Sequence, residues 1–334
     1  MDRRTFTTRL ATGLSLPFVP SPAPARRRPD LPPRLKPGDT VGLITPASFL
    51  DDAGMQEAIT RIEGLGLNVK PGRYVRSENG FLAGTDAERL GDLQAMFGDR
   101  GVQAIWCARG GYGSARLLPD LNFNLIRRNP KILIGYSDIT ALLTAITRET
   151  GLVTYHGPVG SSTFTPYTER YLRAALLEGE TWQPVVPSED STEDRYIIHP
   201  GRATGPLWGG NLSLLAALAG TDYAPPVEGS LLFIEEIGEK PYHIDRMLTQ
   251  LRQAWPLGRA AGVVLGTFTD CAPDPGDRSL SLRQTLTSQL DGLGIPVAYG
   301  LPIGHIKDMC TLPVGMMAEF DALDFRITPQ PQAG

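Results

Sequence analysis

The sequence has few of the residues that build disulfide frameworks and zinc sites. The 334-residue chain contains three cysteines and four histidines. Cys107, Cys271 and Cys310 lie far apart and form no CxxC pair, so neither a disulfide framework nor a zinc knuckle is predicted. There is no HExxH motif, and the histidines fall at no ligand spacing. We therefore expect no metal site.

The chain also lacks long apolar runs and an excess of basic charge. No apolar run reaches the roughly 18 residues needed to span a bilayer. The formal net charge of −4 argues against nucleic acid or anionic lipid as the main partner. At roughly 100–200 residues per domain, the length fits two domains with a core in each. The composition therefore predicts a soluble, acidic, two-domain protein without a membrane span.

The first 25 residues have the pattern of an export signal. Arg3 and Arg4 precede a mildly apolar stretch, which ends at the small-residue site Ala23-Pro24-Ala25. Paired arginines with Phe6 two positions later favour the twin-arginine route, and so a periplasmic location. The whole chain has 32 basic and 36 acidic residues, and residues 1–25 contain three of the arginines and one aspartate. Removal of residues 1–25 would therefore leave 29 basic and 35 acidic residues. The alternative is an ordinary basic amphipathic N-terminus.

Strand-like and helix-like patterns alternate along the first half of the chain. Apolar runs predict buried strands, and apolar residues at helical spacing predict the helices between them. The predicted strands are 40–45, 67–69, 102–107, 131–136 and 152–155, and the predicted helices are 53–65, one that begins at the cap Thr85, and 138–150. This alternation predicts a mostly parallel sheet with helices on both faces, which binds ligands at the carboxyl ends of its strands.

The character of the sequence changes near residue 165, where a second unit is predicted to follow. Residues 184–199 are polar and acidic and are typical of a connection between domains. Roughly alternating residues from 314 to 327 predict antiparallel strands at the end. The predicted boundaries are 26–37 for a flexible leader, 38–165 for an amino-terminal α/β domain, 166–200 for the connection and 201–330 for a carboxyl-terminal domain.

A serine stands where the predicted strand ending at Gly135 meets a helix. Its setting is Gly135-Tyr136-Ser137-Asp138. A serine at such a turn projects its hydroxyl above the sheet edge, near N–H groups that can stabilise an oxyanion. The pattern is not GxSxG, because Asp138 and Ile139 follow the serine. That Ser137 is only the N-cap of the helix therefore remains an alternative.

A glycine-rich turn follows another predicted strand, in Arg109-Gly110-Gly111-Tyr112-Gly113. Glycines let backbone amides approach an anion closely. The spacing does not match GxGxxG and no P-loop lysine is present, so no dinucleotide or ATP cofactor is predicted. We interpret the segment as an oxyanion hole or a carboxylate cradle, with a simple tight turn as the alternative.

Two histidines and one carboxylate are the best remaining candidates for a site. His156 and His305 each lie beside a glycine at a predicted strand end, although most histidines are structural or surface residues. Glu235 follows four apolar residues, and a carboxylate buried there needs a partner such as histidine. The alternative is a strand-end carboxylate in water. Glu236 and Glu239 are expected to face solvent.

These segments together resemble the LD-carboxypeptidase family, the muramoyltetrapeptide carboxypeptidases, which are serine peptidases. The resemblance runs from about Leu35 to Ile327 and follows the family order. The segments that carry it are Ile44-Thr45-Pro46-Ala47-Ser48, Ala108 to Gly113, Gly135-Tyr136-Ser137-Asp138, Trp208-Gly209-Gly210-Asn211-Leu212, Phe233 to Glu239, and Gly304-His305.

The resemblance implies a catalytic triad of Ser137, Glu235 and His305. It also implies an oxyanion hole from the N–H groups of Asp138 and of Gly111. Family members have a flavodoxin-like amino-terminal half with a parallel sheet and a β-rich α/β carboxyl-terminal half, with the active site at the interface. They often form homodimers. The residues that we expect to contact substrate are Arg109, Gly110, Trp208 and Asn211.

The implied reaction removes the terminal D-alanine of murein tetrapeptides, by cleaving its amide with an L-centre that is typically diaminopimelate. The expected partner is thus a murein peptide, and no cofactor is needed. One alternative is an immunity hydrolase of the same family that acts on peptidyl-nucleotides of the microcin C type. Another is a non-catalytic periplasmic peptide-binding protein, which also has two α/β lobes. Such a binder would not require the serine, glutamate and histidine.

Overall fold

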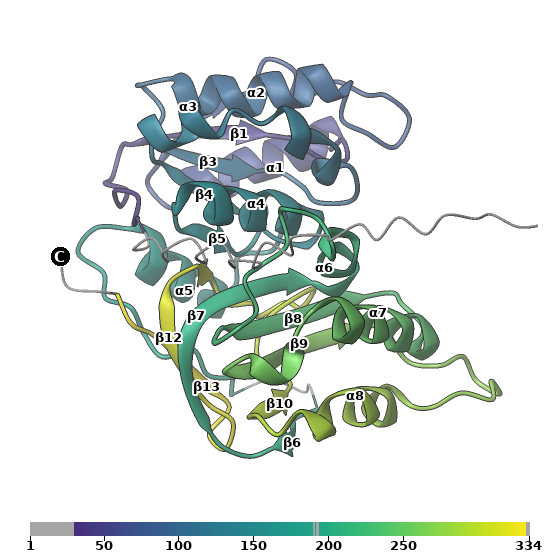
Figure 1. Cartoon of the computed structure of the whole chain (residues 1–334). Helices are drawn as coiled ribbons and strands as arrows, with labels where there is room; N and C mark the ends of the chain where they lie inside the picture. The colour runs from purple at the N-terminus through teal and green to yellow at the C-terminus, as the bar shows by residue number, and fades with distance from the viewer. Residues whose placement is uncertain (1–29, 190, 192–193, 332–334) are drawn as a thin grey trace, which may run out of the picture.

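A computed structural model describes residues 30–189, 191 and 194–331 of the chain. The predicted export signal therefore lies outside the described residues. The chain folds into two α/β parts, each built on its own sheet, with helices α4 and α6 between the two sheets (Figure 1). This architecture confirms the predicted fold class.

The first sheet has the strand order β11-β5-β4-β3-β1-β2, and β1 to β5 run parallel. These strands are β1 (Thr40–Ile44), β2 (Asn68–Pro71), β3 (Ala104–Cys107), β4 (Ile132–Gly135) and β5 (Thr154–His156). The central strands β3 and β4 are buried along their whole length, because helices cover both faces of the sheet. This double cover explains the continuous apolar runs in the sequence.

The helices of this part divide between the two faces. Helices α1 (Asp52–Glu63) and α5 (Pro166–Leu176) pack on one face. Helices α2 (Asp86–Gly98), α3 (Phe123–Arg128) and α4 (Thr140–Thr150) pack on the other. The predicted cap Thr85 begins α2, in a capping box where the Thr85 N–H donates to Glu88 at 2.8 Å.

The second sheet has the strand order β13-β12-β7-β8-β9-β10-β6. Strands β7 to β10 are parallel, and β6 and the β12–β13 pair are antiparallel to their neighbours. The strands are β6 (Tyr196–His199), β7 (Arg202–Asn211), β8 (Leu231–Ile237), β9 (Gly262–Thr269), β10 (Val297–Tyr299), β12 (Met317–Asp321) and β13 (Arg326–Pro329). The helices are α6 (Leu212–Leu218), α7 (Pro241–Ala254) and α8 (Leu282–Leu290).

Two segments differ from the sequence predictions. The predicted flexible leader is docked from Asp30 onward. Leu35 is fully buried, its N–H donates to the Leu176 carbonyl at the end of α5, and its carbonyl accepts the Glu178 N–H just after that helix. The flexible-leader prediction is therefore wrong for this part. The predicted connection 166–200 contains helix α5 and strand β6, which pairs with β10.

The chain returns to the first sheet near its end. Strand β11 (Leu312–Val314) lies in the carboxyl-terminal region but pairs antiparallel with β5. A second junction lies where β7 meets α4, since the Asn211 N–H donates to Thr140 Oγ1 at 3.0 Å. The two parts are thus joined at more than one point, and loops from both converge at the carboxyl ends of the parallel strands. None of the described helices has the length and hydropathy required to cross a bilayer.

Candidate active site

Ser137 lies in a strained turn between β4 and α4. Its φ of 62° is in the left-handed region that favours glycine. The 3₁₀ turn η2 (Ser137–Ile139) begins there, but the Ser137 side chain caps neither η2 nor α4. Instead Ser137 Oγ lies 3.0 Å from His305 Nε2. This geometry disfavours the alternative in which Ser137 is only a helix cap.

His305 connects Ser137 to Glu235. His305 Nδ1 lies 2.8 Å from Glu235 Oε2, and Glu235 is fully buried. A proton on Nδ1 would be donated to the carboxylate, which leaves the Nε2 lone pair directed at the serine hydroxyl. An imidazole held in this way can accept the hydroxyl proton, and the carboxylate stabilises the imidazolium that forms.

A glycine lets the histidine loop approach the carboxylate. Gly304 has a φ of 111°, and a Cβ atom there would lie 2.8 Å from Glu235 Oε2. A side chain at residue 304 would therefore strain the backbone and also press on the carboxylate that His305 contacts.

Glu235 and Glu236 are both buried because β8 is covered on both faces. The register between β8 and β9 shifts between Ile234 and Glu236. Glu236 accepts hydrogen bonds from Asn211 Nδ2 at 2.8 Å and from Ser213 N at 2.8 Å, and burial raises the pKa of Glu236. The prediction that Glu236 faces solvent is wrong, since α6 covers that face.

The loop that carries His305 is held by the amino-terminal part of the chain. Thr165 Oγ1, at the start of α5, donates to Asp308 Oδ1 at 2.7 Å. The Met309 N–H donates to Thr168 Oγ1 at 3.2 Å. Strand β11 then fixes the end of the loop against β5. Sequence reasoning missed these contacts, because a threonine before Pro166 signals only a helix start.

The glycine-rich turn lies against Ser137. A Cβ atom on Gly110 would lie 3.4 Å from Ser137 Oγ. Asp138 fixes this turn, because its carboxylate accepts the Gly113 N–H at 3.2 Å and the Ser114 N–H at 2.8 Å. Within the described ranges, no hydrogen bond engages the N–H of Gly111 or of Asp138. Both N–H groups are therefore available to an oxyanion.

The predicted substrate contacts lie at different depths. Arg109 is exposed beside the turn, and its guanidinium donates to the Phe49 carbonyl at 3.0 Å. Trp208 is buried in the core. Asn211 is also buried, since it caps α6 and donates to Glu236. The structure thus brings Gly110 beside Ser137, whereas the Arg109 guanidinium bonds the Phe49 carbonyl and the Trp208 and Asn211 side chains are packed within the protein.

His156, the other candidate histidine, lies in the core. Its ring contacts the rings of Tyr136 and Phe233, with centroids 6.0 Å and 5.1 Å away. Neither ring nitrogen has a hydrogen-bond partner among the described residues. Burial lowers the pKa of His156 to about 4, so this imidazole is neutral near pH 7.

The described part of the chain contains no group of three or more His, Cys, Asp or Glu side chains that could hold a metal ion. All three cysteines are buried free thiols. Burial raises the pKa of Cys271 to about 11 and also raises the pKa values of Cys107 and Cys310. None of the three is therefore a thiolate at neutral pH.

Two family models match the chain. Residues 41–157 match the LD-carboxypeptidase N-terminal domain, and residues 204–320 match the LD-carboxypeptidase C-terminal domain.

Curated relatives match over most of their length. The chain is 42% identical over 298 residues to a protein named probable murein peptide carboxypeptidase from Bacillus subtilis, covering 88% of this chain and 92% of the relative. It is 34% identical to the murein tetrapeptide carboxypeptidase of Pseudomonas aeruginosa, and the match covers 83% of this chain and 92% of that relative. It is 28% identical to the microcin C7 self-immunity protein MccF of Escherichia coli, with 88% and 94% covered.

Solved structures share the fold. A MccF-like protein from Bacillus anthracis matches with a TM-score of 0.80 and 31% identity, over 91% of this chain and 100% of that chain. A muramoyltetrapeptide carboxypeptidase from Oxalobacter formigenes matches with a TM-score of 0.76 and 31% identity, over 87% of this chain and 97% of that chain.

Proposed function

The chain belongs to the LD-carboxypeptidase family and is a serine-type carboxypeptidase; we propose that it removes the terminal D-alanine from murein tetrapeptides. The observation that carries this proposal is the contact of His305 with Ser137 on one side and with Glu235 on the other, at 3.0 Å and 2.8 Å. These three side chains come from three separate segments, and a helix cap or a surface carboxylate would not need such an arrangement.

The proposed reaction begins when His305 Nε2 takes the proton of Ser137 as Oγ attacks the scissile carbonyl. Glu235 orients the imidazole and stabilises its cation. The N–H groups of Gly111 and Asp138 bind the oxyanion, and loss of one such donor costs about 3 kcal/mol of transition-state stabilisation. The tetrahedral intermediate collapses as His305 donates its proton to the leaving amine of D-alanine. Water, deprotonated by His305, then attacks the acyl-enzyme and regenerates Ser137.

The proposed substrate has an L-centre on the acyl side and a terminal D-residue with a free carboxylate. The names of the Bacillus and Pseudomonas relatives support a murein peptide. Arg109 is exposed beside the glycine-rich turn, so its guanidinium is available to pair with the terminal carboxylate.

The second candidate is hydrolysis of a peptidyl-nucleotide by the same side chains, and the microcin C7 self-immunity relative supports it. To separate the two, the purified chain is incubated with murein tetrapeptide and, in parallel, with a microcin C-type peptidyl-nucleotide. We expect D-alanine release to be faster than cleavage of the nucleotide conjugate. The reverse order would identify an immunity hydrolase. Tight binding of the tetrapeptide without turnover would favour a periplasmic binding protein.

We also propose that the protein acts in the periplasm after twin-arginine export. This rests on Arg3, Arg4 and the small residues at 23–25. A reporter fused after residue 25 should be exported in the wild type and retained when both arginines become lysine. A reporter that stays in the cytoplasm with residues 1–25 attached would contradict the proposal. A homodimer remains a prediction, which light scattering of the purified chain tests.

A further inference from the structure

The two oxygens of the Glu235 carboxylate differ in their partners. Oε2 contacts His305 Nδ1 at 2.8 Å, whereas Oε1 is buried and has no hydrogen-bond partner among the residues that the structure describes. The whole side chain is closed to solvent. A charged carboxylate in the core needs hydrogen bonds on its remaining lone pairs, and one that is held at a single oxygen can turn away from the imidazole. The triad therefore requires a further donor, directed at Oε1.

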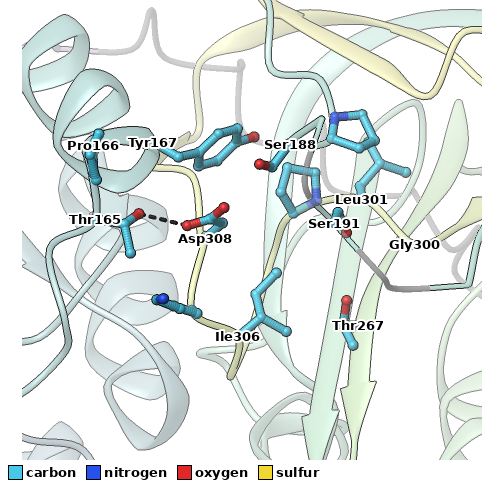
Figure 2. A pocket seen from close by; sticks show the side chains of 13 residues that line it. Thr165, Pro166, Tyr167, Ser188, Ser191, Thr267, Gly300, Leu301, Ile306 and Asp308 are labelled. Carbon is cyan, nitrogen blue, oxygen red and sulfur yellow. Dashed lines mark hydrogen bonds between the residues drawn. The ribbon is translucent and has the colours of Figure 1, made fainter.

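The histidine, in contrast, is held by several contacts of its own. Figure 2 shows the hydrogen bond by which Thr165 fixes Asp308 in the loop that carries His305. The His305 ring also packs against the Tyr136 ring, with centroids 4.8 Å apart. These two contacts restrain the imidazole and leave the carboxylate free, so Glu235 has to be fixed by another residue.

His156 lies close to this carboxylate in the core. Its ring contacts the rings of Phe233, which precedes Glu235 by two residues on β8, and of Tyr136, which precedes Ser137. Burial is the main cause of the lowered pKa of His156, and the Glu235 carboxylate acts on that pKa in the opposite direction. The His156 imidazole is therefore neutral near pH 7 and has one N–H donor to offer.

The donor of His156 is itself unsatisfied. The side chain is closed to solvent, and neither ring nitrogen has a partner in the described ranges. A buried polar group without a partner costs free energy, and an apolar ring would fill the space between Phe233 and Tyr136 without that cost. One water molecule can serve both a buried donor and a buried acceptor, since buried waters typically make about three hydrogen bonds to such groups.

We infer that His156 is a positioning residue of the triad, whose N–H group bonds Glu235 Oε1 through one buried water molecule. This bridge keeps Glu235 Oε2 directed at His305 Nδ1 and stabilises the charge of the carboxylate. His156 contacts no substrate and transfers no proton. The inference rests on the proposed function, because it concerns the same three side chains.

The test is a double-mutant cycle between His156 and Glu235, followed by D-alanine release from murein tetrapeptide. His156→Phe keeps a ring in place and removes the donor, so we expect kcat to fall about 10–100-fold, as for a lost hydrogen bond to a charged group, with little change in KM. In the Glu235→Gln background the same change should lower kcat less than about twofold, because His156 acts only through the carboxylate.

Conservative variants test whether the N–H group is what matters. His156→Asn and His156→Gln each place an N–H group near one of the two ring nitrogens. At least one of them should restore kcat to within about fivefold of the wild type, because the bridge to Oε1 can form again. Thermal melting shows whether each variant folds, and His156→Leu replaces His156→Phe in the cycle if the phenylalanine variant does not.

Tyr155→Phe is the matched control. Tyr155 precedes His156 on β5 and is also buried, but it packs in the core on the other face of the sheet. Loss of its hydroxyl should leave kcat within about twofold of the wild type, since the site is not in contact with it.

Thr267→Val tests a competing donor. The register shift in β8 leaves Thr267 of β9 near Glu235, and the buried Thr267 hydroxyl also lacks a hydrogen-bond partner among the described residues. A fall in kcat with Thr267→Val and none with His156→Phe would assign the donor to Thr267 and overturn the inference.

Equal losses from His156→Phe in the wild-type and Glu235→Gln backgrounds would also overturn it, because His156 would then act on the fold and not through the carboxylate. If the wild type does not cleave the tetrapeptide, the proposed substrate fails, and the same cycle is measured by the rate at which a fluorophosphonate probe labels Ser137. Labelling that His156→Phe slows about tenfold or more, in the wild-type background alone, would still support the positioning role. Absent or unaltered labelling would refute it.

Discussion

Individual residues in this site are constrained by their neighbours rather than by their own preferences. Ser137 has a left-handed backbone, which a serine rarely adopts, and Gly110 leaves room for its side chain. Asp138 does not face a solvent-filled cleft but fixes the glycine-rich turn by two hydrogen bonds from N–H groups. The left-handed backbone of Ser137 costs local stability and places its hydroxyl beside His305.

Glu235→Gln tests the proposed orienting carboxylate. The amide oxygen of the glutamine can still accept a hydrogen bond from His305 Nδ1. The amide N–H group can instead donate to Nδ1, which selects the wrong tautomer of the imidazole. The neutral amide also cannot stabilise the imidazolium. We expect kcat for D-alanine release to fall about 10³–10⁴-fold, with little change in the unfolding midpoint. Steady-state kinetics and thermal melting measure the two effects. A kcat within about threefold of wild type would show that Glu235 has no such role.

His156 should make stability depend on acid. Burial lowers its pKa from an ordinary 6.5 to about 4, so the unfolded chain binds more protons between these values. The stability that depends on neutral His156 is thus fully present above about pH 6.5 and is lost as pH falls toward about 4, with a loss on the order of 2–3 kcal/mol by pH 4.5. Urea unfolding at pH 7 and pH 4.5 should show a smaller loss for His156→Phe than for the wild type. Equal losses in the two proteins would contradict this prediction.

At the scale of elements, the position of the histidine loop depends on close packing against β8. Gly304→Ala should displace the loop, because the new Cβ would lie 2.8 Å from Glu235 Oε2. We expect a fall in kcat of more than about a hundredfold, since a displacement of about 1 Å in a catalytic group has costs of this order. Kinetics of D-alanine release measure it.

Gly276→Ala is the matched control for this variant. Gly276 also has a positive φ, of 89°, but a Cβ atom there meets nothing within 4 Å. The two variants share the backbone strain and differ in the clash with Glu235. The prediction fails if both lower kcat to the same extent.

Periodicity in the sequence predicted the elements whose apolar pattern is local. The runs around Val41, Ile105 and Leu133 predict the buried strands β1, β3 and β4, and the spacing from Met55 to Ile62 predicts α1. Strand β7 was missed because Gly205, Pro206 and the pair after Trp208 interrupt its pattern. Close packing between β7 and β8 requires a glycine at residue 209, because a Cβ atom there would lie 1.8 Å from the Phe233 carbonyl oxygen.

The site was predictable in part, for the same physical reasons. Ser137 and His305 stand beside glycines at strand ends, and Glu235 follows an apolar run, so their sequence settings carry a signal. The residues that hold the histidine loop in place carry almost no such signal in their sequence settings. The bonds of Thr165 to Asp308 and of Thr168 to Met309 join segments about 140 residues apart, and no local pattern encodes such pairs. Glu236 was misjudged because its burial depends on α6.

At the scale of the whole molecule, the two sheets share one hydrophobic core. A single cluster of buried side chains runs from α2 and α4 across α6 and into β8 and β9. Strand β11 adds a second link, since it follows the histidine loop and pairs with β5. Ser137 lies on one part and Glu235 on the other, so the geometry of the site depends on how the two parts pack at this junction.

This shared core predicts that the chain unfolds in a single transition, although chains of this size often unfold in steps. Unfolding in urea is followed by circular dichroism and by tryptophan fluorescence, which reports Trp106 and Trp182 in the first part and Trp208 and Trp255 in the second. The two curves should have the same midpoint. Two separate transitions would mean that the parts fold independently and that the junction contributes little.

The central claim is that Ser137, activated across this junction, performs the hydrolysis. The most direct measurement is the rate of D-alanine release from murein tetrapeptide by the wild type and by Ser137→Ala under identical conditions. We predict that the wild type turns over repeatedly and that the variant loses at least about 10⁴-fold in kcat while it still binds the peptide. Turnover by Ser137→Ala at a rate close to that of the wild type would contradict the account.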